Sequence, residues 1–210
     1  MVKKRERKPK SERLPEVLIL KKEDTPTLTA VLARRIQDER AARSWSLQEF
    51  ALRSGVSRAM ISKIERGECS PTAVILSRLS GALGLTMSQL LTDAEGNGSR
   101  LRRVDKQQIW VDPETKYRRR SVSPDVGMPL QLVEVELPPL TKISMPAAAY
   151  KFLHQQIWVL DGKLRFWEGE DIWDMNPGDC LQLTAPRDCA FENPSKSKVS
   201  RYVVALVVRG

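Results

Sequence analysis

Apolar residues recur at two different spacings along the chain, and the spacing changes near Ile109. In the first half, Leu28, Leu32 and Ile36 repeat every fourth residue, which places them on one face of a helix. From residue 109 the apolar runs are short, and Pro, Gly and Asp interrupt them, as in QQIWV, QLVEVELPP, QIWVLDG, DCLQLTAP and RYVVALVV. The pattern therefore predicts a helical half followed by an all-β half with the strand spacing of a sandwich or barrel.

Four regions follow from this pattern. Residues 1–24 are basic and show little periodicity, so they are expected to form a mostly disordered arm. Residues 25–91 are helical in pattern. Residues 92–108 contain the turn-rich stretch TDAEGNGSR and are predicted to be a linker, and residues 109–210 form the β half. The predicted fold class is thus multi-domain α + β.

Residues 44–91 carry start and stop signals for short helices. Ser46 and Glu49 have the spacing of a capping box, and Trp45 and Phe50 have the spacing of a hydrophobic staple around it. Gly55 suits a break with positive φ. The later boundaries are predicted from Ser57 as an N-cap, Gly67 as a helix end, Ser70-Pro71 as a helix start, Gly84 as a helix end, and Thr86 with Gln89 as a cap. Together with a helix at residues 28–43, they predict five short helices.

Two of these helices, at residues 47–53 and 57–66, are joined by the turn Ser54-Gly55-Val56, which is the arrangement of a helix-turn-helix. In that motif the first helix braces against the DNA backbone and the second enters the major groove. Ile61 and Ile64 would face the core, which leaves polar and small side chains outward for base and phosphate contacts. The predicted DNA-contacting residues are Ser46, Gln48, Ser57, Arg58, Ala59, Ser62 and Lys63.

The charge distribution indicates different roles for the two halves. Residues 109–210 hold thirteen basic and thirteen acidic residues, so the net charge of +9 lies in residues 1–108. A basic half beside a neutral half indicates that the first half faces a polyanion such as double-stranded DNA. Three widely spaced cysteines, no apolar run of membrane-spanning length and no secretory signal favour a cytoplasmic protein without membrane contact.

The stretch GVSRAMISKIERGECSPT closely resembles the recognition-helix region of the XRE family, the phage repressor and Cro-like helix-turn-helix proteins. The resemblance covers the helical half and rests on the frame Gly-Val-Ser…Ser-x-Ile-Glu-x-Gly. A protein-interaction module with a solvated basic face is the alternative. Four arginines of the first helix are expected to make phosphate contacts or salt bridges rather than read bases: Arg34, Arg35, Arg40 and Arg43.

The β half resembles the cupins, double-stranded β-helix proteins in which two sequence motifs place histidines and a glutamate around a metal. Gly162 in YKFLHQQIWVLDG fits the last glycine of the first motif, while Gly178 and Asn193 in NPGDCLQLTAPRDCAFEN fit the ends of the second. The ligand positions then fall on Gln155 for the glutamate, on Cys189 for the third histidine, and on Ala148 and Tyr150, or Ala149 and Lys151 with the shorter spacing, for the histidine pair. The resemblance implies the cupin fold without its metal ligands.

His154, the only histidine, lies next to a ligand position and not on it. If Gln155, Ile157 and Val159 face the barrel interior, His154 and Trp158 face outward, because successive strand residues point to opposite sides. We therefore predict no metal site, no cofactor and no catalytic residue. An apolar interior with a few polar groups is typical of a small-ligand site, and the candidate polar groups are Tyr150, Gln155, Gln182 and Cys189.

Two further motifs leave alternatives open. Cys180 and Cys189 suit a redox pair if they face each other across a hairpin, and otherwise suit small buried residues. The run YRRR at residues 117–120 suits an anion site or, as the favoured interpretation, a charged and exposed strand.

An XRE-type helix-turn-helix followed by a cupin implies a bacterial transcription regulator that acts as a homodimer, because paired recognition helices read paired half-sites. The cupin would contribute dimer contacts and a pocket for an unidentified small-molecule effector. Two other functions stay open. One is a cupin metalloenzyme, a dioxygenase or isomerase, with a DNA-binding appendage, and the other is a cupin that serves only as a dimerisation block. The sequence does not distinguish repression from activation.

Overall fold

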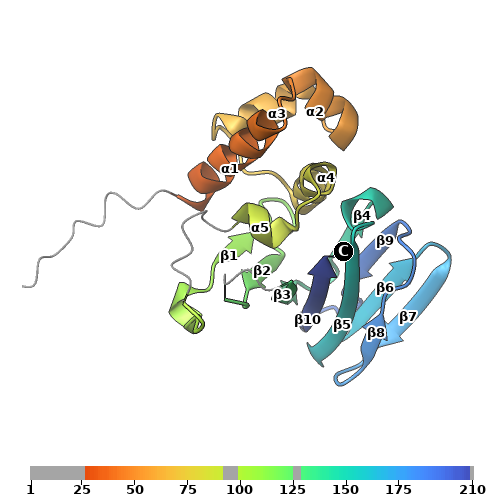
Figure 1. The fold of residues 1–210 in the computed structure, drawn as a ribbon. Coiled ribbons are helices and arrows are strands. Elements are labelled where there is room, and N and C mark those ends of the chain that lie inside the picture. Colours follow the sequence, from red (N-terminus) through yellow and green to blue (C-terminus); the bar gives the residue numbers. More distant parts are fainter. Residues whose placement is uncertain (1–26, 92–98, 125–128, 209–210) are drawn as a thin grey trace, which may run out of the picture.

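The computed structural model describes residues 27–91, 99–124 and 129–208, in which a helical head (residues 27–91) lies against a barrel (residues 109–208) (Figure 1). The predicted arm at residues 1–24 and residues 92–98 of the predicted linker lie outside the described residues. The helices are α1 (Leu28–Ala42), α2 (Leu47–Ser54), α3 (Arg58–Glu65), α4 (Ala73–Leu83) and α5 (Met87–Leu91), with short 3-10 helices at Val104–Lys106 and Ala147–Ala149. None of these described helices is long and apolar enough to cross a membrane.

The helices of the helix-turn-helix lie within one residue of their predicted bounds: α2 ends at Ser54 instead of residue 53, and α3 covers Arg58–Glu65 instead of residues 57–66. The Ser46 hydroxyl accepts a hydrogen bond from the Glu49 N–H at 3.1 Å, and the Glu49 carboxylate accepts one from the Ser46 N–H at 2.7 Å, so the capping box is confirmed. Trp45 and Phe50 pack with their ring centroids 6.0 Å apart. Gly55 follows α2 with a φ of +66°, a left-handed conformation that glycine adopts without steric cost.

The predicted start of the fourth helix at Ser70-Pro71 is wrong by two residues. The N-cap is Thr72, whose hydroxyl accepts a hydrogen bond from the Ile75 N–H at 3.4 Å, and α4 begins at Ala73. The Ala73 N–H donates to the carboxylate of Asp112, a barrel residue 39 positions further along the chain. A tertiary contact thus satisfies the first free N–H of the helix, and local sequence signals do not reveal it.

The described residues of the β half form two antiparallel sheets. The strands are β1 (Ile109–Val111), β2 (Arg118–Ser121), β3 (Leu130–Leu137), β4 (Lys142–Met145), β5 (Leu153–Asp161), β6 (Leu164–Glu168), β7 (Asp171–Met175), β8 (Cys180–Gln182), β9 (Cys189–Glu192) and β10 (Ser200–Val208). The larger sheet has the order β1-β2-β3-β10-β5-β8, and the smaller sheet has the order β4-β9-β6-β7. Strands that are distant in sequence pair in both sheets, as expected for the double-stranded β-helix of a cupin.

The core of the barrel lies between the two sheets. Phe191 of the smaller sheet stacks on Tyr202 of the larger sheet, with ring centroids 5.8 Å apart. In β5 the side chain of Ile157 is buried, while His154 and Trp158 are exposed. The predicted alternation of this strand is therefore confirmed, with Gln155, Ile157 and Val159 toward the interior.

Gly162 and Asn193, two residues of the cupin motifs, are required by the backbone around them. Gly162 has a φ of +77°, and a Cβ atom there would lie 2.5 Å from the carbonyl oxygen of Val199. Asn193 is fully buried, and its amide donates to the carbonyl oxygens of Leu137 at 2.9 Å and Lys198 at 2.8 Å. These motif residues therefore stabilise turns of the fold independently of any metal.

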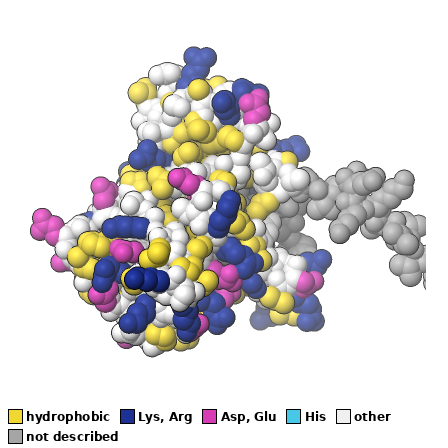
Figure 2. Space-filling view, turned by 180° about the vertical axis from the view of Figure 1, so that it is seen from behind, with side chains coloured by type: hydrophobic (Ala, Val, Ile, Leu, Met, Phe, Trp, Pro, Cys, Tyr) yellow, Lys and Arg dark blue, Asp and Glu magenta, His cyan; other side chains and the backbone are white. Residues whose placement is uncertain are grey.

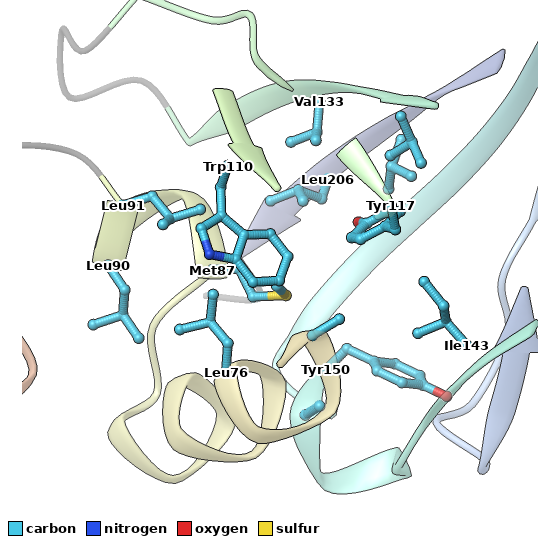
Figure 3. Close-up of a cluster of buried hydrophobic side chains, with 14 of the residues drawn as sticks. Leu76, Met87, Leu90, Leu91, Trp110, Tyr117, Val133, Ile143, Tyr150 and Leu206 are labelled. Atoms are coloured by element: carbon cyan, nitrogen blue, oxygen red, sulfur yellow. The ribbon is translucent and has the colours of Figure 1, made fainter. Parts of the chain in front are cut away.

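The helical head packs against the barrel through α4 and α5, and one hydrophobic core includes residues of both. Figure 3 shows Leu76 of α4 and Met87 of α5 beside Trp110 of the barrel. The backbones also approach closely, because a Cβ atom on Gly81 of α4 would lie 2.7 Å from the carbonyl oxygen of Ala148. The helical head and the barrel are therefore closely packed against each other.

Candidate nucleic-acid interface and barrel cavity

Helix α3 presents the candidate DNA-contacting side chains, and the rest of the helical head fixes its position. Ile61 and Ile64 are buried in the core. Glu65, the last residue of α3, accepts two hydrogen bonds from Arg40 of α1, from Nε at 2.7 Å and from Nη2 at 2.8 Å. These side chains are only 7% and 16% exposed, so solvent weakens the contact little. The pair holds the end of α3 against α1.

The outward side of α3 carries two cations that form no salt bridge with the described residues. Arg58 and Lys63 are exposed, and neither forms an ion pair within the described parts of the chain. Ala59 is exposed beside them, and the Ser57 hydroxyl caps the helix by accepting a hydrogen bond from the Met60 N–H at 3.3 Å. Solvated cations around a helix N-terminus can meet phosphates and the guanine edge in a major groove.

The other predicted DNA-contacting residues differ in their exposure and in their hydrogen bonds to other residues of the protein. Gln48 is exposed at the start of α2. Ser46 is also exposed, but its hydroxyl is used in the capping box. Ser62 is half-buried, and its hydroxyl accepts a hydrogen bond from Arg66, which also pairs with Glu68. Ser62 is thus the least accessible of the predicted contacts.

All four arginines expected to make phosphate contacts or salt bridges form salt bridges. The pairs are Arg34–Asp38 at 4.0 Å, Arg35–Glu39 at 2.8 Å, Arg40–Glu65 at 2.7 Å and Arg43–Glu39 at 2.6 Å. Figure 2 shows Lys and Arg side chains with few acidic ones beside them on this face of the helical head at the top, whereas many side chains of both signs are interspersed over the barrel. The cations of α3 are therefore less neutralised locally than those of α1.

A cavity of about 70 Å³ lies between the barrel and the helical head. Three of the four polar groups predicted for a ligand pocket line it, from the barrel side: Tyr150, Gln155 and Cys189. Residues of the helical head line the opposite side: Ser77, Ser80, Thr86 and Met87. Both halves of the molecule thus form the wall of the same cavity.

Gln182, the fourth predicted pocket residue, lies outside this cavity. Its side chain is exposed, and its amide donates to the carbonyl oxygens of Gln155 and Leu183, both at 2.9 Å. Leu181 is the more buried residue of the short strand β8. The alternation in this strand therefore has the opposite phase from the one that the sequence interpretation required.

Tyr150 and Cys189 are neutral groups at the barrel side of the cavity. The Tyr150 hydroxyl donates to the carbonyl oxygen of Arg187. Burial raises the pKa of Tyr150 far above its ordinary value and raises the pKa of Cys189 to about 12. Both groups are therefore protonated near neutral pH, so neither is an activated nucleophile or a general base there.

Of the positions matched to cupin metal ligands, Ala149, Tyr150, Gln155 and Cys189 line this cavity, whereas Ala148 and Lys151 do not. The side chains that line it do not fit a divalent metal. Tyr150, Gln155 and Cys189 offer a protonated phenol, an amide and a protonated thiol in place of imidazoles and a carboxylate. His154 is exposed on the outer side of β5. Among the described residues, no group of three or more His, Cys, Asp or Glu side chains could hold a metal ion.

The hypothesis of a redox pair between Cys180 and Cys189 is wrong. Cys180 is exposed and Cys189 is buried. Their strands do not form a hairpin, because β8 pairs with β5 in the larger sheet while β9 pairs with β4 and β6 in the smaller one. The alternative of a small buried residue holds for Cys189.

Sequence reasoning missed a charged residue in the cavity. In β2, Arg118 and Arg120 face outward and pair with Glu136 at 2.6 Å and Glu134 at 3.4 Å. Arg119 faces inward, is only 7% exposed and lines the cavity. The interpretation of YRRR as an exposed strand is therefore wrong for Tyr117 and Arg119, which are both buried. Strand alternation could have revealed this, but the run of like charges concealed it.

Comparisons with known proteins agree with this architecture. The helix-turn-helix family model HTH_3 matches residues 36–90. The HTH-type transcriptional regulator SutR of Escherichia coli (strain K12) is 35% identical over 178 residues, which cover 82% of this chain and 92% of SutR. An HTH_3 family transcriptional regulator from Vibrio cholerae has the same fold, with a TM-score of 0.72 and 19% identity over 87% of this chain and 98% of that one.

The identity and coverage show that the chain belongs to the HTH-type transcriptional regulators, and in it the helix-turn-helix is joined to a cupin domain. Hydroxypropylphosphonic acid epoxidase from S. wedmorenis is a more distant match, with a TM-score of 0.42 and 16% identity over 86% of this chain and 99% of that one. This likeness is too weak to bear on the chemistry of the cavity.

Proposed function

We propose that the chain acts in the cytoplasm as a homodimeric, sequence-specific regulator of transcription whose cupin cavity binds a small-molecule effector. The observation that carries this proposal is the shared cavity, because helices of the DNA-binding head and strands of the cupin line the same space. A ligand that binds one placement of the two halves better than another shifts the population between them. A shift of α4 would be passed on to the DNA-binding helices, because α4 packs against α1 and α2 of the head.

The proposed DNA-reading surface is the exposed side of α3 with the start of α2. Arg58 and Lys63 would contact guanine edges or phosphates, and the methyl group of Ala59 would meet a thymine methyl. Ser57 and the first N–H groups of α3 would meet a phosphate at the positive helix end. Peripheral contacts are proposed for Ser46, Gln48 and Ser62.

A second copy of the chain is the proposed partner of the outer face of the larger sheet. Leu130, Leu132 and Trp158 are 47%, 37% and 50% exposed on this face. Val203 and Ala205 lie between them, because Ala205 is opposite Leu132 and Val203 is opposite Trp158. An exposed apolar stripe of this kind is typical of an association surface.

Two further considerations favour a two-fold dimer through this face. Arg118, Arg120 and Arg201 beside this stripe form salt bridges with Glu136 and Glu134, which reduces like-charge repulsion between two copies. A two-fold dimer also presents two recognition helices to two half-sites, which one protomer cannot do.

We also propose that the cupin is not an enzyme. Tyr150 and Cys189 provide no acid–base pair, and the donor set does not suit a metal. Elemental analysis of the purified full-length protein tests this, with far less than one iron, manganese or zinc per chain expected. A stoichiometric metal would instead support the alternative of a metalloenzyme with a DNA-binding appendage.

A footprint on the promoter of the gene that encodes the chain tests the regulatory function. The expected result is protection of two half-sites about 34 Å apart, one helical turn of DNA. No protected site there or at neighbouring promoters would contradict the proposal. A thermal-shift screen of amino acids, polyamines and organic acids tests the effector, and a screen without any stabilised case would favour a cupin that only dimerises.

A further inference from the structure

A buried cation of the cavity has no acidic partner. Arg119 is 7% exposed, and it forms no ion pair with any Asp or Glu of the described residues. Its Nε–H group is buried and has no hydrogen-bond partner among those residues. A buried charge and a buried unpaired donor both cost free energy, so an anion that reaches Arg119 stabilises the folded protein.

The unpaired Nε–H group of Arg119 lies on the Nε–Nη2 edge of the guanidinium, which is an edge with which arginine binds carboxylates. Arg40 uses this edge in the same protein, where Nε and Nη2 donate to the two oxygens of Glu65 at 2.7 and 2.8 Å. In Arg119, Nη2 donates to the Ser88 hydroxyl of α5 at 3.1 Å, and Nε is left over. A planar anion with two oxygens matches both donors of the edge, whereas a neutral amide has only one acceptor oxygen.

The remaining wall of the cavity is mostly apolar. Val135, Ile143, Val204 and Leu206 line it, beside Met87 of the helical head. These side chains suit a hydrocarbon chain. The volume of about 70 Å³ limits that chain to a few carbons unless α4 and α5 move.

We propose that Arg119 binds the carboxylate of a small organic acid whose apolar chain fills the cavity. This inference rests on the proposed function, because it gives the chemical class of the effector. A carboxylate on the Nε–Nη2 edge takes the place of the Ser88 hydroxyl, so the ligand replaces a contact between the barrel and α5. Ligand binding and the placement of the DNA-binding head are thereby linked at one side chain.

Pairs of acids and their neutral amides test the site on the full-length protein. Propionate and butyrate are compared with propionamide and butyramide by thermal shift and calorimetry. At least one acid is expected to bind and raise the Tm, and its amide to bind about ten- to a hundred-fold more weakly, because a charge-assisted two-point contact is lost.

Two variants locate the site. Arg119→Gln should lose the acid-dependent rise in Tm. Arg165→Gln removes the same charge from the outer side of β6, in the smaller sheet, and should bind the acid as the wild type does. Equal binding of acid and amide, no binding of either acid, or unchanged binding by Arg119→Gln overturns the proposal. The acid–amide comparison uses the wild-type protein, so it tests the proposal even if Arg119→Gln does not fold.

Operator binding with and without the acid separates this proposal from the wider one. Acid binding that leaves operator affinity unchanged supports the Arg119 site and contradicts regulation through it. If neither acid binds but another ligand changes the operator affinity, the proposed Arg119 site is overturned. The proposed regulatory function is still supported in that case.

Discussion

The carboxylate of Asp112, in the turn between β1 and β2, accepts a hydrogen bond from the backbone N–H of Ala73, the first residue of α4. Its other oxygen accepts from the N–H groups of Glu114 and Thr115, both at 2.8 Å. One buried side chain thus shapes its own turn and starts a helix of the DNA-binding head. The head and the barrel are joined at a helix terminus as well as through the hydrophobic core.

Asp112→Asn should lower the free energy of unfolding by about 1–3 kcal/mol, because an amide cannot accept all three hydrogen bonds and leaves a buried donor unpaired. Urea denaturation measures the change. Asp105→Asn, in the exposed 3-10 helix before β1, is the matched control and should be near neutral. Equal stability of the two variants would contradict a structural role for the carboxylate.

Gly81→Ala should also destabilise the protein, by about 1–3 kcal/mol, because the added Cβ meets the Ala148 backbone. Helix propensity alone predicts the opposite sign, a gain of about 1 kcal/mol for alanine in a helix. The free energy of unfolding therefore distinguishes the two effects directly. Arg78→Ala, at an exposed position of α4, controls for changes in the helix itself. A stabilised Gly81→Ala protein would mean that α4 and residues 147–149 do not pack closely.

Arg58→Ala combined with Lys63→Ala should weaken binding to a specific operator far more than binding to bulk DNA. Each base contact contributes about 1–3 kcal/mol of discrimination, and fluorescence anisotropy on both DNAs measures the difference. Arg34→Ala with Lys106→Ala removes the same charge from exposed positions outside α3 and should lower both affinities slightly. Equal losses on operator and bulk DNA for the α3 variant would show that the reading face lies elsewhere.

Trp158→Arg should convert the proposed dimer to a monomer, because it buries a charge in the proposed association surface. Analytical ultracentrifugation measures the mass, and operator binding should fall with it. Ile172→Arg is the matched control, since this side chain is also 50% exposed but lies on β7 of the other sheet. A monomeric Ile172→Arg protein beside a dimeric Trp158→Arg protein would move the interface to the smaller sheet.

The Cys189 thiol should resist alkylation at pH 8, while the exposed Cys180 reacts readily. With its pKa raised from 9.0 to about 12, only about one Cys189 thiol in ten thousand is ionised at pH 8. Mass spectrometry of partially alkylated protein locates the modified cysteine. In the unfolded chain the thiol ionises near its ordinary pKa, so its contribution to stability is constant below pH 9 and declines as the pH rises toward 12. Rapid alkylation of Cys189 in the folded protein would contradict this account.

The helix-turn-helix could be predicted from the sequence because its determinants are local. The capping pair Ser46–Glu49 and the glycine at position 55 act on residues within one turn of themselves. The start of α4 could not be predicted in this way, because Asp112 supplies one of its hydrogen bonds from the other half of the chain. The local sequence predicts the start of a helix only where side chains close in sequence accept the hydrogen bonds of its first N–H groups. Where a distant residue accepts one of them, the local sequence is not sufficient.

The pocket residues were harder to predict because strand phase depends on pairing. In the long strand β5 the alternation around Ile157 is unambiguous, and Gln155 lines the cavity as expected. The three-residue strand β8 is too short to show its phase, and Gln182 lies outside the cavity. Arg119 was missed for a related reason, because adjacent arginines give no apolar–polar contrast along β2.

The close contact of α4 and α5 with the barrel has a consequence for engineered biosensors. A chimera that grafts a foreign cupin behind residue 91 would transplant only part of the cavity wall, since Ser77, Ser80, Thr86 and Met87 would stay behind with the recipient. It would also set the bare Gly81 of α4 against a surface not shaped for it. The segment that holds the whole cavity wall therefore begins at Thr72, and a splice placed before that residue transfers the complete cavity to its new host.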